Sequence, residues 1–292
     1  MNVDQYIGNT PIVELKNISP NSKVRIYTKL EGQNPGGSVK DRAAYGMISK
    51  ALERGDIKTG DTLIEATSGN TGIALAMIAS IKGLKMKLIM PDSATRERVL
   101  TMKAYGAEVI LTPSAKTIEY SREFAEKEAK ENGYFILNQF ANPDNYGMHF
   151  ETTGPEIWKQ TEGKITHFVS AMGTTGTIMG VSKYLKSVNP SIQIVGTQPQ
   201  EGSKIPGIRR WSPEFLPKIF DPKRVDKIID VSQDEAIQQA RQLAKQEGIL
   251  AGMSSGGALA AALKLAATLE EGIIVTIACD KGDRYLSSDL FG

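Results

Sequence analysis

The chain has few of the residues from which several common kinds of site are built. Among its 292 residues there is one cysteine, Cys279, which excludes an intramolecular disulfide and a cysteine-based metal cluster. The two histidines, His149 and His167, lie in unrelated stretches, so we expect neither a metal site nor a histidine-based catalytic triad.

Long apolar runs and an excess of one charge are also lacking. The longest apolar run, 73–79, is far too short to cross a bilayer. The 35 basic and 33 acidic residues are interspersed, without the basic stripe of a nucleic-acid binder. Residues 1–6 lack the basic start and apolar core of a signal peptide. We therefore expect a cytoplasmic protein that binds neither membranes nor nucleic acid.

What is present is the pattern of a globular α/β enzyme. Apolar residues make up 40% of the chain and charged residues 23%, and the length allows two lobes. Strands are predicted at 24–30, 62–66, 86–90, 108–111, 134–137, 165–170, 192–196, 227–231 and 273–278. Helices are predicted at 42–48, 72–81, 95–105, 117–130, 178–187, 233–246 and 258–269. This alternation implies parallel-rich sheets flanked by helices, with right-handed crossovers.

Three local patterns refine this outline. Ser232 and Glu235 form a capping box that opens the helix ending near Gln246. Residues 142–145 (Asn-Pro-Asp-Asn) are predicted to be a loop and the main hinge. Residues 198–222 hold five of the 13 prolines, which favours an irregular excursion on the surface.

The segment 34–42 (Asn-Pro-Gly-Gly-Ser-Val-Lys-Asp-Arg) brings Lys40 to the first turns of a helix. A lysine withdrawn from water has a depressed pKa and is the nucleophile of Schiff-base chemistry, with carbonyl substrates or with pyridoxal 5′-phosphate. A lysine at a helix start is more often a solvated surface residue, so the rest of the chain must decide.

Two strand-to-helix turns are rich in Gly, Ser and Thr. Residues 67–72 (Thr-Ser-Gly-Asn-Thr-Gly) suit a small anion at a helix N-terminus, although a plain capped turn explains them equally well. Residues 173–177 (Gly-Thr-Thr-Gly-Thr) carry more hydroxyls than a cap needs, which favours phosphate binding. This second motif differs from the lysine-bearing P-loop and from the dinucleotide fingerprint.

A third turn, 251–257 (Ala-Gly-Met-Ser-Ser-Gly-Gly), precedes the helix expected from Ala258. Its serines either cap that helix or direct a hydroxyl at a ligand. A Schiff-base lysine, a phosphate loop, an anion site and a spare hydroxyl together suit a cofactor with one aldehyde and one phosphate that acts on an amino acid. In an α/β sheet such loops converge at the carboxyl ends of the strands.

These motifs resemble those of the fold-type II pyridoxal-phosphate (PLP) enzymes. The likeness is to the cysteine synthase (O-acetylserine sulfhydrylase) family, most closely its B type, and it covers essentially the whole chain. The motifs that carry it are 7–11, 37–42, 67–72, 153–158, 173–177, 254–257 and 283–287, with 207–211 and 279–280 pointing to the B type. The resemblance implies a two-lobed, tryptophan synthase β-like fold and PLP as cofactor.

The resemblance also implies roles for individual residues. Lys40 corresponds to the Schiff-base lysine and the catalytic base. The remaining cofactor contacts would be Asn70 at the ring oxygen, Ser254 at the pyridine nitrogen, and Gly173, Thr174, Thr175, Gly176 and Thr177 around the phosphate. The substrate carboxylate would be held by Thr67, Ser68, Thr71 and Gln139.

The implied reaction is β-replacement, which forms L-cysteine from O-acetyl-L-serine and sulfide. Related enzymes keep other activities open. These are a cystathionine β-synthase-like or O-phosphoserine-using reaction, a serine or threonine dehydratase, and a protein that binds PLP or a partner without catalysis. A hydroxyl at the pyridine nitrogen, in place of a carboxylate, suits elimination over transamination.

The paired arginines Arg209 and Arg210 precede Trp211 in the Pro-rich excursion. They are either a solvated basic pair or a contact for an anionic second substrate. Because a guanidinium binds a tetrahedral oxyanion through two parallel hydrogen bonds, we expect Arg210 to admit thiosulfate as well as sulfide, giving S-sulfocysteine.

We expect two lobes and a homodimer. The smaller lobe would comprise residues 35–143 with 1–12, and the larger lobe residues 144–292 with 13–34. The homodimer is implied by the resemblance alone.

Overall fold

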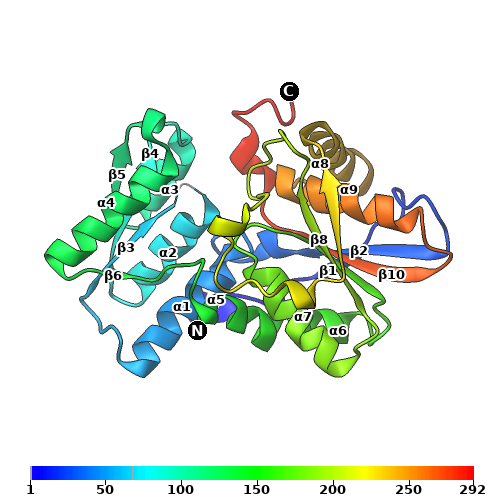
Figure 1. The fold of residues 1–292 in the computed structure, drawn as a ribbon, viewed down its shortest axis with the longest axis horizontal. Helices are drawn as coiled ribbons and strands as arrows, with labels where there is room; N and C mark the ends of the chain where they lie inside the picture. Colours follow the sequence, from blue (N-terminus) through cyan, green and yellow to red (C-terminus); the bar gives the residue numbers. More distant parts are fainter. Residues whose placement is uncertain (1, 68) are drawn as a thin grey trace.

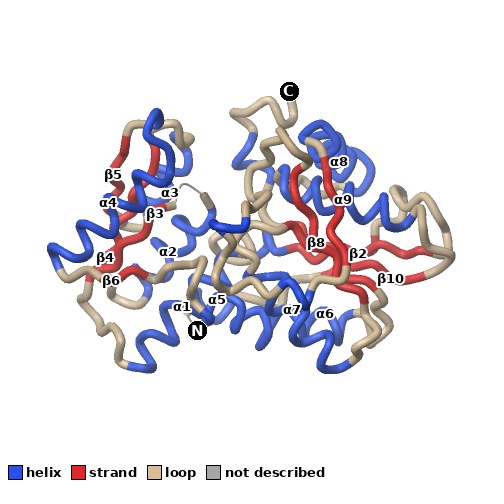
Figure 2. The backbone as a smooth tube through the Cα atoms, in the orientation of Figure 1, coloured by secondary structure: helices blue, strands red, loops and turns tan. Residues whose placement is uncertain are grey.

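The computed structural model describes residues 2–67 and 69–292. It contains two parallel-rich sheets that lie side by side, each flanked by helices (Figures 1 and 2). The predicted α/β fold is therefore confirmed.

The larger sheet has six strands in the order β1-β2-β10-β7-β8-β9, and only the β1–β2 pair is antiparallel. Its strands are β1 (Ile12–Glu14), β2 (Val24–Leu30), β7 (His167–Ala171), β8 (Gln193–Pro199), β9 (Lys227–Val231) and β10 (Gly272–Ala278). Successive side chains face opposite sides of a strand. Phe168 therefore packs into one hydrophobic cluster with Ile178, while Val169 packs into another with Leu259.

Helices cover both faces of this sheet (Figure 1). They are α6 (Gly154–Gln160), α7 (Gly176–Val188), α8 (Gln233–Glu247) and α9 (Met253–Ala266). Helix α7 supplies Ile178 to the cluster around Phe168, and α9 supplies Leu259 to the cluster around Val169, so these two helices lie on opposite faces.

The smaller sheet has four parallel strands in the order β5-β4-β3-β6. They are β3 (Thr62–Ala66), β4 (Lys85–Pro91), β5 (Glu108–Thr112) and β6 (Phe135–Ile136). The helices of this half and of the junction are α1 (Lys40–Arg54), α2 (Asn70–Ile81), α3 (Arg96–Ala104), α4 (Thr117–Asn132) and α5 (Pro143–Met148). Leu63 packs in a cluster with residues of α1 and α2, whereas Ile64 packs in a second cluster with residues of α4.

Several element boundaries differ from the expectation, and two of the differences have a clear physical reason. Asn142–Asn145 was predicted as a loop, but Asn142 accepts a hydrogen bond from the Asp144 N–H and caps α5, which starts at Pro143. Helix α9 starts at Met253 and not near Ala258. A Cβ at Gly256 would lie 2.0 Å from the Ala236 carbonyl oxygen, so this glycine serves the close packing of α9 on α8. The division into lobes at 35 and 143 stays a prediction.

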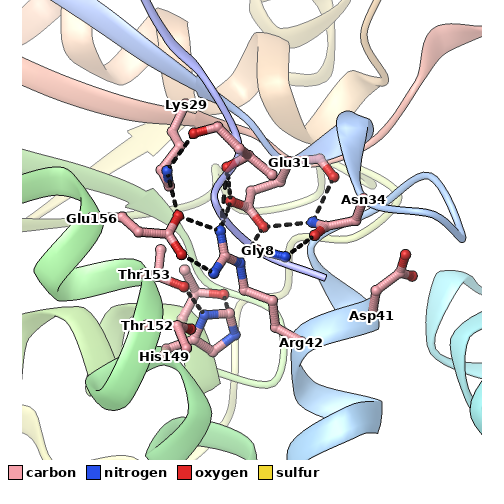
Figure 3. A network of polar contacts seen from close by, with 12 residues as sticks. Gly8, Lys29, Glu31, Asn34, Asp41, Arg42, His149, Thr152, Thr153 and Glu156 are labelled. Atoms are coloured by element: carbon pink, nitrogen blue, oxygen red, sulfur yellow. Dashed lines mark hydrogen bonds and ion pairs between the residues drawn. The ribbon is translucent and has the colours of Figure 1, made fainter. Parts of the chain in front are cut away.

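A buried ionic network anchors the segment that precedes and opens α1 (Figure 3). The Arg42 guanidinium pairs with Glu31 at 2.7 Å and with Glu156 of α6 at 2.7 Å, and Lys29 of β2 pairs with the same Glu156. Burial alone would raise the pKa of Glu31, but Arg42 outweighs it and lowers that pKa to about 2. Arg42 follows Lys40 by two residues, so this network fixes the backbone that carries the lysine.

Candidate active site

A cavity of about 930 Å³ is lined by residues from both sheets, near the carboxyl ends of β3, β7 and β10. Position at this edge is what an open α/β sheet predicts for a ligand site. The predicted site residues that line it are Lys40, Thr67, Asn70, Thr71, Gln139, Gly173, Thr174, Thr175, Gly176, Thr177, Arg210 and Ser254. The structure therefore brings together every predicted residue that it describes, and Ser68 lies outside the described residues.

Lys40 is the first residue of α1 and follows a tight turn in which Gly37 has φ +80°. Burial lowers the pKa of the Lys40 amine, and the nearby Cys279 and Asp280 only partly oppose this. Within residues 2–67 and 69–292, no side chain or carbonyl accepts a hydrogen bond from Lys40 Nζ. Lys40 is half-buried and lines the cavity, and its amine has no hydrogen-bond partner in the described part of the chain, as suits a Schiff-base lysine.

The loop 173–177 follows β7 and opens α7. Its glycines are needed sterically, because a Cβ at Gly173 would lie 2.6 Å from the Gly207 carbonyl oxygen and one at Gly176 would lie 2.0 Å from Asn145 Oδ1. Thr175 has φ +69°, and its buried hydroxyl has no hydrogen-bond partner in the described part of the chain. An unpaired hydroxyl beside a helix N-terminus suits an anion such as phosphate.

The predicted carboxylate site is built from the turn after β3 and the turn after β6. The Thr71 hydroxyl donates to Gln139 Oε1 at 2.9 Å. The oxygen of this amide is therefore occupied by Thr71, and its N–H groups can donate to another group. Glu65 holds the second turn, since its carboxylate accepts the backbone N–H of Asn138 at 3.1 Å and that of Gln139. Burial raises the pKa of Glu65 to about 7, against the effect of these N–H groups.

Asn70, the first residue of α2, is held on both sides of its amide. Its Nδ2 donates to Asp280 Oδ2 at 2.7 Å, and its Oδ1 accepts from Arg284 at 2.6 Å. The Tyr285 hydroxyl donates to the same Asp280 oxygen at 2.7 Å. Arg284 and Tyr285 belong to the 283–287 motif, but nothing in the sequence assigned them to Asn70.

Ser254 lies at the second position of α9, and the helix cap is Gly252, so Ser254 is not the cap. It is buried and lines the cavity together with Cys279. The neighbouring Ser255 instead accepts the Cys279 backbone N–H at 2.9 Å. Of the two serines, Ser254 is therefore the one with access to a ligand.

The Pro-rich excursion is more than a surface loop, because several of its residues line the cavity. Trp211 donates its indole N–H to the Gly173 carbonyl at 2.9 Å and so braces the phosphate loop. Arg210 pairs with Asp230 and donates to the Pro199 carbonyl at 2.8 Å. Its guanidinium would have to leave Asp230 to bind a second substrate.

Two further arginines of the cavity were missed in the sequence. Arg98 of α3 lies 5.7 Å from the centre of the Tyr285 ring, and Arg122 of α4 lies 4.4 Å from that of Phe140. Both sit in charged helical stretches, where nothing distinguishes them from solvated surface residues.

No group of three or more metal-ligating side chains is found in the described part of the chain. No helix formed by the described residues has the length and apolar character needed to cross a membrane.

Comparisons with known proteins agree with this geometry. Residues 3–280 match the model of the family "Pyridoxal-phosphate dependent enzyme". The chain belongs to this family of PLP-dependent enzymes.

Within the family, the similarity is to cysteine synthases. The chain is 59% identical to cysteine synthase B of Pseudomonas aeruginosa over 98% of its own length and 95% of the relative's. It is 54% identical to cysteine synthase B of Escherichia coli, over 99% and 96%. A crystal structure of cysteine synthase (OASS) from Entamoeba histolytica superposes with a TM-score of 0.94 at 40% identity, over 99% of this chain and 90% of that one.

The residues present fit PLP. The unpaired amine of Lys40 suits its aldehyde, and the 173–177 loop with the unpaired Thr175 hydroxyl suits its phosphate. Asn70 and Ser254 line the same cavity and would reach the ring oxygen and the pyridine nitrogen.

Proposed function

We propose that the enzyme forms L-cysteine from O-acetyl-L-serine and sulfide by PLP-dependent β-replacement. The observation that carries the proposal is a single cavity lined both by a half-buried lysine, whose amine has no partner among the described residues, and by a threonine-rich loop at a helix N-terminus. Similarity to cysteine synthases over nearly the full length supports it.

When bound, PLP supplies an electron sink that weakens the Cα–H bond of the amino acid and lets acetate leave from Cβ. Lys40 would bind the cofactor aldehyde, then take the α-proton on Nζ and return it after sulfide has added to Cβ. Its lowered pKa favours the neutral amine that this proton transfer needs.

The other predicted residues would bind and orient. Thr67, Ser68, Thr71 and Gln139 would hold the substrate carboxylate. Because the Thr71 hydroxyl donates to Gln139 Oε1, that amide would present its N–H groups to the carboxylate. Ser254 would place a hydroxyl at the pyridine nitrogen and leave it largely unprotonated, which suits elimination.

An assay of products separates this reaction from its rivals. Cysteine that appears only when O-acetylserine and sulfide are both present supports the proposal. Pyruvate or 2-oxobutyrate from serine or threonine would identify a dehydratase, and cystathionine from homocysteine a cystathionine synthase. Turnover of O-phosphoserine in place of O-acetylserine would identify the phosphoserine-using form.

We also propose thiosulfate as a second sulfur donor, which would yield S-sulfocysteine. Arg98, Arg122 and Arg210 line the cavity and favour an anionic substrate at its mouth. Arg210→Ala should weaken thiosulfate use by about 1.5–3 kcal/mol, the scale of one hydrogen bond from a charged group, and spare sulfide.

The deciding measurement is kcat/KM for both donors in the wild type and in three single variants, Arg98→Ala, Arg122→Ala and Arg210→Ala. An equal loss for both donors in Arg210→Ala would give Arg210 a structural role. A thiosulfate-specific loss only in Arg98→Ala or Arg122→Ala would move the anion contact to that residue.

A homodimer in the cytoplasm completes the proposal, on the strength of the family likeness. Light scattering coupled to gel filtration tests the dimer, and fractionation of the source cells tests the location.

A further inference from the structure

His149 lies beside the buried network that precedes α1 and contacts the loop 173–177. It opens a π-helical turn, η4 (His149–Thr153), and is 1% exposed, close to the Arg42–Glu156 pair (Figure 3). Its Nδ1 lies 2.8 Å from Thr153 Oγ1, and its Nε2 lies 3.3 Å from the hydroxyl of Thr177. Thr177 belongs to the predicted phosphate loop and lines the cavity.

The imidazole is neutral at physiological pH. Burial and then the nearby Arg42 guanidinium lower the pKa of His149 to about 3. A neutral imidazole has one donor nitrogen and one acceptor nitrogen, so the contacts on its two sides are linked.

Thr153 decides which nitrogen carries the hydrogen. Its hydroxyl is fully buried and has no hydrogen-bond partner other than His149 Nδ1 among residues 2–67 and 69–292. The Thr153 O–H therefore donates to Nδ1, and Nε2 carries the ring hydrogen. That N–H donates to Thr177 Oγ1, which leaves the Thr177 hydrogen directed at another acceptor.

We propose that Thr153 and His149 are positioning residues of the phosphate site, which orient the Thr177 hydroxyl so that it donates into the cavity, to the cofactor phosphate. The proposal rests on the proposed assignment of 173–177 to the phosphate. These hydrogen bonds form a relay from Thr153 through His149 to Thr177. Without the relay the Thr177 hydroxyl is free to rotate, so it donates to the phosphate for only part of the time.

The backbone is built to hold this contact. In the π-helical turn, His149 and Thr153 lie close enough for their side chains to bond, and such turns are frequent at functional sites. Helix α7 approaches His149 at Gly180, where a Cβ would lie 2.5 Å from His149 Cβ and 2.2 Å from the Tyr146 carbonyl oxygen. Glycine at this position lets the imidazole reach Thr177, one turn earlier in α7.

The first test measures the dissociation constants of PLP and of pyridoxal, which lacks the phosphate, from the apoenzyme. His149→Phe and Thr153→Val should each weaken PLP about tenfold or more, as expected for a hydrogen bond to a charged group, and change pyridoxal by less than about twofold. His149→Gln keeps an N–H donor and should recover most of the PLP affinity.

Thr152→Val is the matched control. Thr152 neighbours the relay in sequence, but its hydroxyl donates to the Met148 carbonyl at the end of α5 at 2.6 Å, so its loss should leave PLP affinity unchanged. In a Thr177→Val background, His149→Phe should change PLP affinity little further, because each substitution by itself already breaks the same relay.

The second test observes the tautomer directly. With two histidines in the chain, the ring ¹⁵N resonances of His149 can be assigned by comparison with His167→Asn. We expect Nε2 protonated and Nδ1 unprotonated in the wild type, with and without PLP.

Three results would overturn the relay. They are a protonated Nδ1, an equal loss of pyridoxal and PLP affinity in His149→Phe, and no rescue by His149→Gln. If Thr177→Val alone leaves PLP binding intact, Thr177 does not bind the phosphate and the relay fails with it. A loss in Thr177→Val without a loss in His149→Phe or Thr153→Val refutes only the relay. The cysteine assay tests the proposed reaction separately.

Discussion

At the scale of a residue, the environment of Lys40 matters more than its position at a helix start. Lys40→Ala removes the amine that would bind the cofactor aldehyde and move the α-proton. We expect turnover to fall by several orders of magnitude, because two roles fail together. The variant should also retain no cofactor after borohydride reduction and denaturation. Lys50→Ala, in the exposed part of the same helix, is the control. Cofactor fixed on Lys40→Ala would assign the Schiff base to another lysine.

A second residue-scale prediction concerns His149 and pH. Its pKa is lowered from 6.5 to about 3 in the folded protein, so the unfolded chain binds the proton more tightly. The free energy of unfolding should therefore fall as the pH drops from about 6.5 towards 3. His149→Gln removes this contribution. The free energy of unfolding of the wild type, relative to that of the variant, should therefore fall as the pH is lowered over that range. A constant difference between pH 7 and pH 4 would show that His149 titrates normally.

The sequence could predict those site residues whose type and spacing are unusual. Lys40 after a Gly-rich turn, and the threonines of 173–177 after a strand, are of this kind. Arg98 and Arg122 could not be found this way, because only the packing of α3 and α4 turns them to the cavity. Arg210 was predicted as an open anion contact, but its pairing with Asp230 depends on β9, which is distant in the sequence.

At the scale of an element, the capping box of α8 is a local signal that the fold preserves. Ser232 Oγ accepts the Glu235 N–H at 3.1 Å, and the Glu235 carboxylate accepts the Ser232 N–H at 2.7 Å. Ser232→Ala should lower the free energy of unfolding by about 1 kcal/mol, as measured by denaturant titration, because the Glu235 N–H loses its acceptor. Ser187→Ala, whose hydroxyl only bonds a carbonyl of its own exposed helix end, should stay within about 0.5 kcal/mol. Equal effects of the two changes would contradict the capping argument.

Element boundaries were predicted well where local chemistry decides them and poorly where packing does. Strands β2, β3 and β9 have the predicted bounds, because turn residues flank their apolar pattern. The start of α9 was missed because Gly256 and Gly257, taken alone, suggest a turn. Their place inside a helix is explained only by the close packing of α8 against them.

At the scale of the whole molecule, the C-terminal segment joins parts that are far apart in the chain. Arg284 follows the last strand of the larger sheet, yet it donates to Asn70 of α2, 214 residues away, and to the Gly36 carbonyl in the turn before Lys40. Neither contact has a local signature, and no pattern in one sequence could have predicted them. Because α2 packs on the smaller sheet, Arg284 ties the two halves of the cavity together.

Arg284→Ala should therefore loosen the cavity and lower stability at once. Loss of hydrogen bonds from a charged donor should cost about 1–3 kcal/mol in unfolding free energy. Hydrogen exchange should increase in 36–41 and 69–73, where the acceptors lie, and should be unchanged in β8 and β9 of the larger sheet. Arg284→Lys keeps the charge but lacks the planar fork that reaches both acceptors, so we expect an intermediate effect. Unchanged exchange at 69–73 in Arg284→Ala would mean that Asp280 alone holds Asn70, and that the two halves are joined without the C-terminal segment.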